Sequence, residues 1–437
     1  MELKKYNNIL KINQIVHSVS ETHRFDKDKL IAINTSDVEN GMMNGGTLTP
    51  VEELKGQFKK TIMKGDILFS EIRPANRRFA KVTIEDCDNF VVSTKLMVLR
   101  KYNKDVDLEY FYYCLTNQHF LNILQRRAEN RIGSFPQITF DLLSEYAFPI
   151  PPISEQKRIS KVISTLDKKI AINRAINQNL EAMAKQLYDY WFVQFDFPDE
   201  KGRPYKSSGG KMVWNEKLKR EIPQGWDVKT MGNCTTILLG GTPDTNDSSL
   251  WGDGYNWLNS GEVAEFPILS SEKYITQKGL EKSSTVLAPK GSVTLSITRH
   301  LRPSILCIDA CINQSVVAIL ENEILTNEYI YPLVNREIPR LMSLRTGAQQ
   351  PHINKEIVES INVVIPPQGI LYAYIKKSKS FYKSIFINAQ EIADLAKQRD
   401  ELLPLLMNGQ VLVNSDLAAS LMLKIMVIHS NIATGHK

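Results

Sequence analysis

The chain has 437 residues, of which 43% are hydrophobic, and its 54 Lys and Arg side chains exceed its 48 Asp and Glu by a formal net charge of +6. Single cores usually stop growing near ~250–300 residues, so we expect several domains, and the mild basic bias permits a polyanionic partner without demanding one. The five Cys residues lack the paired spacing of a zinc site, and no apolar run would span a bilayer, which argues against a secreted or membrane protein and favours a reduced, cytoplasmic chain.

The sequence of the first part of the chain is typical of strands and an amphipathic helix that are separated by turns containing Gly and Pro. A turn at Lys64–Asp66 leads into an alternating strand that closes on Arg73. Asp107 then opens a helix whose first free N–H groups it can cap. The segment ends at Phe148–Pro152. We predict an α+β globular domain over residues 1–150.

A long helix is predicted next, from about Glu155 to Phe192. Counting forward from Ile159 in alternate steps of four and three residues gives mostly apolar positions, with Asn at two of them. This spacing is typical of the seam of a coiled coil. The seam positions are Ile159, Ile163, Leu166, Ile170, Asn173, Asn177, Leu180, Ala184 and Leu187. Such a helix of ~38 residues is ~57 Å long and exceeds one turn of DNA.

Blocks of the first domain recur in order in the second half of the chain. Lys64–Arg73 matches Lys290–Arg299, Asp107–Tyr112 matches Thr326–Tyr331, Arg131–Ser134 matches Arg345–Ala348, and Phe148–Pro152 matches Val363–Pro367. The offset between matching blocks shrinks along the chain, as expected when loops are shortened while the elements persist. We therefore predict a second α+β copy over residues 223–366.

A second long helix begins at about Gly369, and its seam has the same register as the first. Its positions are Tyr374, Ser378, Phe381, Ile385, Asn388, Ile392, Leu395, Arg399 and Leu402. Asn388 is the counterpart of Asn173, so antiparallel packing of the two helices would bring these two amides together. A buried Asn pair would weaken the coil but fix its register. Two solvated polar residues in an imperfect helix are the alternative.

Antiparallel pairing of the helices would place one globular copy at each end of a rigid spacer, related by a pseudo-two-fold axis. Proteins of this symmetry read half-sites about one helical turn apart, ~34–36 Å. The architecture therefore predicts a bipartite DNA site with an unread gap. Because the two copies differ in sequence, the half-sites should also differ.

Short motifs stand at fixed places along the chain. They are Ile150–Gln156 and Ile365–Pro367 before the helices, Ile222–Trp226 and Gly240–Pro243 at the start of the second copy, the linker from Trp191 to Met212, and the ending Leu402–Gly409. Each motif is weak alone, but together and in this order they are specific. Over nearly its whole length the chain resembles the specificity subunits of type I restriction–modification enzymes.

The resemblance implies that each globular copy is a target recognition domain for one half-site and that the paired helices also dock methyltransferase subunits. The domains would be target recognition domain 1 (1–150), spacer helix 1 (151–192), a linker (193–222), target recognition domain 2 (223–366) and spacer helix 2 (367–411). Residues 412–437 depart from the family and stay unassigned.

The resemblance also implies that the chemistry belongs to partner subunits. Two methyltransferase subunits would methylate adenine N6 with S-adenosylmethionine, and ATP-driven, Mg-dependent restriction subunits would join for cleavage. This chain would bind double-stranded DNA, hold no cofactor or metal and catalyse nothing itself. It lacks a Gly-x-x-x-x-Gly-Lys-Ser/Thr phosphate loop, the Asn/Asp-Pro-Pro-aromatic motif of adenine methyltransferases and a metal-ligand cluster.

Three other interpretations stay open. The chain could be a coiled-coil adaptor that binds proteins, an orphan or inactive specificity subunit, or an enzyme that cuts or methylates alone. Pro198–Lys201 faintly resembles the acidic–lysine signature of metal-dependent nucleases, but it lies in a Gly- and Pro-rich linker with no strand to hold it.

Loops rich in Arg, Asn, Gln and His are the candidates for DNA contact, because Arg neutralises phosphates and Arg, Asn and Gln read base edges bidentately. The candidates are Arg73, Asn76, Arg77 and Arg78, with the counterparts Arg299, His300 and Arg302, and the pre-helix residues Arg131, Ser134 and Gln137, matched by Arg345, Gln349, Gln350 and His352. A solvated charged loop is the alternative for each. Recurrence favours Arg73 and Arg299, and the resemblance suggests that the pre-helix loop is partly structural.

Overall fold

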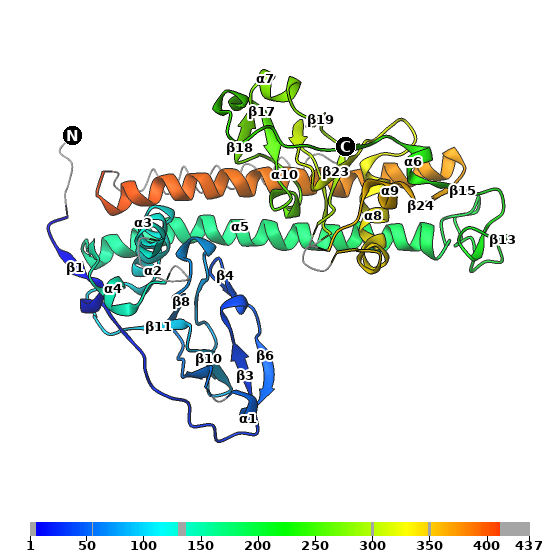
Figure 1. Ribbon diagram of the computed structural model, residues 1–437. Coiled ribbons are helices and arrows are strands. Elements are labelled where there is room, and N and C mark those ends of the chain that lie inside the picture. The colour runs from blue at the N-terminus through cyan, green and yellow to red at the C-terminus, as the bar shows by residue number, and fades with distance from the viewer. Residues whose placement is uncertain (1–5, 55, 130–136, 299–300, 348–350, 411–437) are drawn as a thin grey trace. The chain divides into compact units, whose positions relative to one another are not determined.

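The computed structural model of the chain describes residues 6–54, 56–129, 137–298, 301–347 and 351–410. The chain divides into two compact units, one of Met1–Lys169 with Leu395–Lys437 and one of Ile170–Asp394. Two long helices, α5 (Ile153–Tyr188) and α10 (Gln368–Met407), contribute residues to both units (Figure 1). Each unit therefore consists of one globular copy and one part of each long helix.

Within its described residues, the first copy combines short strands with four α-helices. The strands are β1 (Ile9–Lys11), β2 (Val16–Ser18), β3 (Lys29–Ile33), β4 (Val38–Glu39), β5 (Met42–Met43), β6 (Thr47–Pro50), β7 (Phe58–Lys60), β8 (Ile67–Ser70), β9 (Phe79–Lys81), β10 (Phe90–Ser93), β11 (Leu96–Lys101) and β12 (Ala147–Pro149). The helices are α1 (Val51–Leu54), α2 (Leu108–Thr116), α3 (Gln118–Glu129) and α4 (Phe140–Ser144). Two four-stranded sheets have the orders β2-β11-β8-β9 and β6-β3-β10-β7, and β1 pairs with β12.

The second copy repeats this topology. Its strands are β13 (Met212–Asn215), β14 (Arg220–Pro223), β15 (Asp227–Thr230), β16 (Ile237–Leu239), β17 (Trp251–Leu258), β18 (Lys273–Ile275), β19 (Val286–Ala288), β20 (Val293–Ser296), β21 (Pro303–Ile305), β22 (Ala310–Ile312), β23 (Val316–Ile319) and β24 (Asn362–Ile365), and its helices are α6 (Met231–Cys234), α7 (Gln277–Glu281), α8 (Asn327–Ser343) and α9 (Lys355–Glu359). The sheet orders β16-β23-β20-β21 and β18-β17-β22-β19, with β15 paired to β24, match those of the first copy. The one parallel pair in each second sheet, β3 with β10 and β17 with β22, also recurs. The chain thus has mixed helix and strand content in two repeated domains.

Strand β8 in the first copy is apolar on both faces, because each face packs against a separate core. In β8, Ile67 and Phe69 belong to the core that contains α2 and α3, whereas Leu68 belongs to a second core with Val92 and Val98. A turn precedes this strand in both copies, with Gly65 at φ 91° and Gly291 at φ 93°. A side chain at this backbone geometry would be strained, so the repeated Gly sets where the strand begins.

The aromatic helix of the first copy is part of the hydrophobic core. Its buried side chains include Tyr110, Phe111 and Leu115 of α2 and Phe120 and Leu124 of α3. Both helices therefore pack into the core of the first copy.

Gln156 connects the start of α5 to the segment that opens α2. Its side chain is fully buried, and its Oε1 accepts a hydrogen bond from the Asp107 backbone N–H at 2.7 Å. Its Nε2 donates to the carbonyl oxygens of Asp105 at 2.9 Å and Pro151 at 2.7 Å. Because one buried amide satisfies three backbone groups, it fixes the angle at which the long helix leaves the first copy.

The two long helices run antiparallel in the second unit. Asn388 Nδ2 donates to Asn177 Oδ1 at 2.9 Å, and Asn173 Nδ2 donates to Glu391 Oε2 at 2.7 Å, so partners rise along one helix as they fall along the other. The expectation that the amides of Asn173 and Asn388 bond to each other is wrong. Asn388 instead donates to Asn177, which lies one turn beyond Asn173 on α5. Asn173 donates to the Glu391 carboxylate.

The seam positions of both helices are buried or half-buried throughout, including Ile163, Ala184 and Tyr374. After Tyr188 the first long helix continues as a short π-helical segment, Asp189–Val193, which agrees with the predicted end near Phe192. Within the described residues no helix is long and apolar enough to cross a bilayer, and no group of three or more potential metal ligands comes together. The tail, 412–437, lies outside the described residues.

Candidate nucleic-acid interface

The first candidate loop connects β8 to β9 and contains a short 3₁₀ turn, Pro74–Asn76. Arg73 and Arg77 flank this turn in the left-handed backbone region, at φ 46° and 53°. Such conformations are costly for residues other than Gly and persist where the surroundings enforce them. Here the Ala75 backbone N–H donates to Gln125 Oε1 of α3 at 3.1 Å, which fastens the tip of the loop to the helix.

Arg77 holds the loop in place from inside the protein. Its Nε donates to Asn40 Oδ1 at 2.7 Å, its Nη1 donates to Gln118 Oε1 at 2.5 Å, and its guanidinium lies 5.5 Å from the centre of the Phe79 ring. Burial lowers the pKa of Arg77 below its ordinary value, and the nearby positive charge of Arg399 lowers it further. These contacts suit a residue that positions the loop.

Of the other three candidate side chains in this loop, Arg78 bonds to neighbouring residues, whereas Arg73 and Asn76 are exposed. Arg78 donates to the Ser36 carbonyl oxygen at 3.2 Å and forms an ion pair with Glu39 at 3.6 Å. Arg73 and Asn76 are exposed, and within the described part of the chain their side chains have no hydrogen-bond or ion-pair partner. Arg73 and Asn76 are therefore the side chains of this loop that remain available to a phosphate or a base edge.

The loop before the long helix joins the first loop through backbone bridges. Ile72 pairs with Gln137, the Ile138 N–H donates to the Glu71 carbonyl oxygen at 2.7 Å, and Gln137 Nε2 donates to Glu71 Oε2 at 2.8 Å. The two loops, which are 64 positions apart between Arg73 and Gln137, therefore form one surface.

The same joint recurs in the second copy. Thr298 pairs with His352, and the Ile353 N–H donates to the Ile297 carbonyl oxygen at 3.0 Å. A serine at the end of the central strand also repeats its hydrogen bond, with Ser70 Oγ on the Ile72 carbonyl oxygen and Ser296 Oγ on that of Thr298, both at 3.2 Å. We call the joined loops of each copy its loop pair: residues 71–78 with 137–138, and, among the described residues of the second copy, 297–298 and 301–302 with 345–347 and 351–353.

The second loop pair carries different side chains. Arg302 and His352 are exposed, and the backbone of His352 also exchanges two hydrogen bonds with Thr346, both at 2.9 Å. Arg345 Nε donates to the Met342 carbonyl oxygen at 3.1 Å, so this residue is partly engaged with α8. The remaining candidates lie outside the described residues: Arg131, Ser134, Arg299, His300, Gln349 and Gln350.

Sequence reasoning missed the residues that hold the first loop. Asn40 and Gln118 lie 37 and 41 positions from Arg77, and nothing in their local sequence marks them as its partners. A sequence does not show whether an arginine is exposed or hydrogen-bonded within the protein. Only the fold shows that Arg73 is exposed and that Arg77 bonds to Asn40 and Gln118.

Comparison with known proteins gives a match for each copy. The family model described as "Type I restriction modification DNA specificity domain" matches residues 7–182 and 223–396. The chain is 29% identical over 452 residues to the Type I restriction enzyme HindI specificity subunit of Haemophilus influenzae, a match that covers 89% of this chain and 96% of that protein. It is 24% identical to the Type I restriction enzyme MjaIX specificity subunit of Methanocaldococcus jannaschii, over 70% of this chain and 69% of that protein.

Among solved structures, the Type-I restriction-modification system S subunit from M. genitalium matches with a TM-score of 0.50 and 14% identity, over 93% of this chain and 97% of that one. At this identity the match speaks for the fold alone. The two family matches fall one on each repeated copy, and together they cover most of the sequence. The chain belongs to the family of type I restriction modification DNA specificity domains.

Proposed function

We propose that this chain is the specificity subunit of a type I restriction–modification enzyme and that each copy reads one half of an asymmetric, two-part site on double-stranded DNA. The observation that carries the proposal is the loop pair, which has the same backbone joint in both copies but different exposed side chains. A repeated scaffold with different side chains suits two related but unequal half-sites. Specificity subunits are non-catalytic, so methylation and cleavage belong to partner subunits.

We further propose that α5 and α10 form a coiled-coil spacer that sets the unread gap, within the bounds 151–192 and 367–411. The buried seams and the hydrogen bonds of Asn177 with Asn388 and Asn173 with Glu391 support this role. A polar contact inside an apolar seam penalises any slip of one helix along the other, because a slip leaves an amide unpaired. A spacer that cannot slip keeps a constant gap.

The partners would be two methyltransferase subunits, one for each copy, and restriction subunits that join for cleavage. The methyltransferase subunits would use S-adenosylmethionine to methylate adenine N6, and ATP and Mg would serve the restriction subunits. In the second unit α5 exposes three large apolar side chains, Ile172 (55% exposed), Ile176 (40%) and Met183 (49%). Clustered apolar side chains on a helix surface are typical of a protein interface, which supports docking on this part of α5.

Sequencing of N6-methyladenine in cells tests the proposal directly. Cells that carry this gene with its cognate methyltransferase gene are compared with cells that lack this gene alone. We expect a bipartite, non-palindromic motif that disappears when the gene is absent. Unchanged methylation would contradict the proposal and favour an orphan or inactive subunit, or a protein-binding adaptor.

DNA binding of the purified complex separates the remaining alternatives. A DNA-reading protein loses affinity steeply as salt rises, because phosphate contacts release counterions. An adaptor that binds proteins would show no such slope. Methylation or cleavage by the chain without partner subunits would contradict the non-catalytic role.

A further inference from the structure

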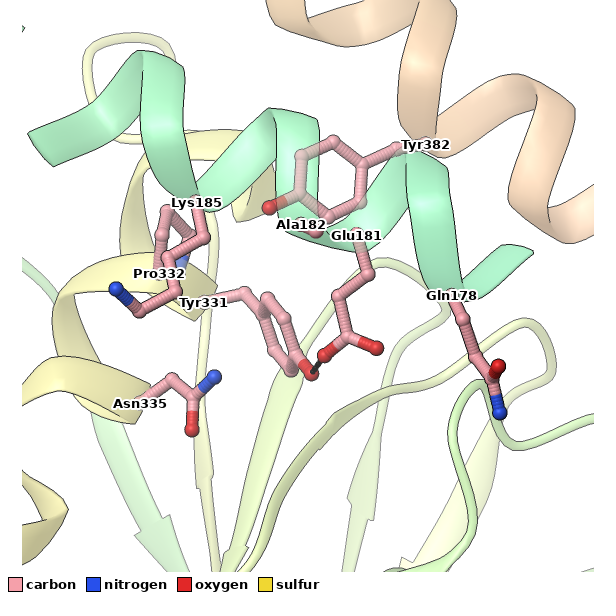
Figure 2. Close-up of a pocket in the computed structure, with 8 residues that line it drawn as sticks. All are labelled: Gln178, Glu181, Ala182, Lys185, Tyr331, Pro332, Asn335 and Tyr382. Atoms are coloured by element: carbon pink, nitrogen blue, oxygen red, sulfur yellow. Dashed lines mark hydrogen bonds between the residues drawn. The ribbon is translucent and has the colours of Figure 1, made fainter. Parts of the chain in front are cut away.

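A small cavity lies in the second unit beside α5. Its volume is about 290 Å³, and it is lined by Gln178, Glu181 and Lys185 of α5, Tyr331 and Asn335 of α8, and Tyr382 of α10. Figure 2 shows the Glu181 carboxylate and the Tyr331 phenol meeting in it, with Lys185 and Asn335 on the same side as the Tyr331 ring. The cavity thus combines one carboxylate, one ammonium group, two phenol rings and two amides.

The equivalent place in the first unit is filled by an arginine. By the repeat, Tyr331 corresponds to Tyr112 and Tyr382 to Asp167, while Ala184 of α5 corresponds to Arg399 of α10. Arg399 Nη1 donates to Asp167 Oδ1 at 2.9 Å, and its Nε donates to Asp400 Oδ1 at 2.8 Å. In the first unit, therefore, the Arg399 guanidinium lies at this position and bonds to the carboxylates of Asp167 and Asp400.

The second unit has a carboxylate here but no cation at the position that corresponds to Arg399. Ala184 ends at its methyl group, and Glu181 stands where the first unit has Ala396. Glu181 Oε1 accepts a hydrogen bond from the Tyr331 hydroxyl at 2.7 Å, while its Oε2 has no partner within the described residues. Lys185, the cation nearest in sequence, is held by Asp189 at 2.7 Å. A half-buried carboxylate with a free oxygen and, within the described residues, no cation bonded to it favours a positively charged ligand.

We propose that this cavity binds the guanidinium group of an arginine side chain supplied by a methyltransferase subunit. The proposal rests on the proposed function, because it needs that subunit to dock here. Guanidinium fits better than an ammonium ion, since its planar fork bonds carboxylate oxygens and stacks on aromatic rings. Ile176 and Met183 lie on the opposite face of α5 from Glu181, so charge complementarity with Glu181, and not that apolar surface, favours the arginine in the cavity.

The test measures binding of the full-length chain to its cognate methyltransferase subunit. Glu181→Gln keeps the shape of the side chain and removes its charge. Glu216→Gln is the matched control, because Glu216 is exposed and pairs only with neighbours on the β13–β14 hairpin. We expect Glu181→Gln to weaken the association by about tenfold or more and Glu216→Gln to leave it unchanged. The melting temperature of each free variant shows whether it remains folded.

A competitor distinguishes guanidinium from cations in general. Ethylguanidinium chloride should weaken the association of the wild-type chain more than ethylammonium chloride at equal concentration, and this difference should vanish in Glu181→Gln. Equal affinity of the wild type and Glu181→Gln would overturn the proposal while leaving the proposed function intact. If the folded wild-type chain did not bind the methyltransferase subunit at all, the proposed function and the proposal would both fall.

Discussion

Tyr110 in the first copy and Tyr329 in the second make the same hydrogen bond. The Tyr110 hydroxyl donates to the Pro149 carbonyl oxygen at 2.8 Å, and the Tyr329 hydroxyl donates to the Val364 carbonyl oxygen at 2.5 Å. Both rings are fully buried, and both acceptors lie on the last strand before a long helix. The bond links α2 to β12 in the first copy and α8 to β24 in the second, and each of these strands directly precedes a long helix.

Tyr110→Phe and Tyr329→Phe should each lower the free energy of unfolding by about 1–1.5 kcal/mol, because each leaves a buried carbonyl without its donor while the ring packing stays. Urea unfolding measures the loss, and hydrogen exchange locates it in β12 for the first variant and in β24 for the second. Tyr146→Phe is the control, since the Tyr146 hydroxyl has no hydrogen bond within the described residues. A loss as large in the control would show that the hydroxyl bonds are not responsible.

The sequence predicts the repeat where matching residues pack in the core. Lys64–Arg73 and Lys290–Arg299 keep the turn glycine and the buried central strand, so their correspondence is visible without a structure. Before about Lys59 the correspondence is loose, yet β3 and β17 occupy the same place in their sheets. These strands are placed by backbone pairing, which many side chains allow, so topology persists where sequence similarity fades.

The candidate interface was predicted as a region rather than as residues. Its loops were identified by their basic and amide side chains, but the division between Arg73 and Arg77 depends on Asn40 and Gln118, which are remote in sequence. The bridge between Ile72 and Gln137 likewise joins segments that no local pattern connects.

Asn388→Leu should destabilise the helix pair by about 1–3 kcal/mol, because Asn177 Oδ1 loses its donor inside a largely apolar seam. Asn177→Leu with Asn388→Leu should recover part of this loss, since neither amide is then left unpaired. A double-mutant cycle by urea unfolding measures the coupling. Additive losses would mean that the two amides do not interact in solution.

Arg399→Ala should destabilise the first unit by about 2–3 kcal/mol, since it leaves Asp167 and Asp400 without their shared cation. Both carboxylates keep about a third of their surface exposed, which moderates the loss. Burial by itself disfavours the charged guanidinium, but the hydrogen bonds to Asp400 and Asp167 raise the pKa of Arg399, so this guanidinium stays charged across the neutral range.

Lys185→Ala is the matched control for Arg399→Ala, because its ion pair with Asp189 lies on the surface of α5. Exposed pairs of this kind contribute less than about 1 kcal/mol. Chemical denaturation of the two variants compares the losses. Similar losses would show that the buried arrangement of Arg399 adds nothing to the stability of the first unit.

The first loop pair should separate into residues that touch DNA and one that positions them. Arg73→Ala and Asn76→Ala should each weaken binding to the intact site by about 1–3 kcal/mol without changing the free energy of unfolding, because both side chains are exposed and without partners in the described part of the chain. Arg77→Ala should weaken binding and also destabilise the fold, since Asn40 and Gln118 lose their donor.

Binding to DNA in which one half-site is scrambled shows which copy each residue serves. A residue of the first loop pair should lose its effect when its own half-site is scrambled and keep it when the other half-site is. Arg302→Ala, in the second loop pair, is the reciprocal variant and should show the opposite dependence. If both variants responded to the same half-site, the two copies would not read separate halves, and the loop pairs would not be the reading surfaces.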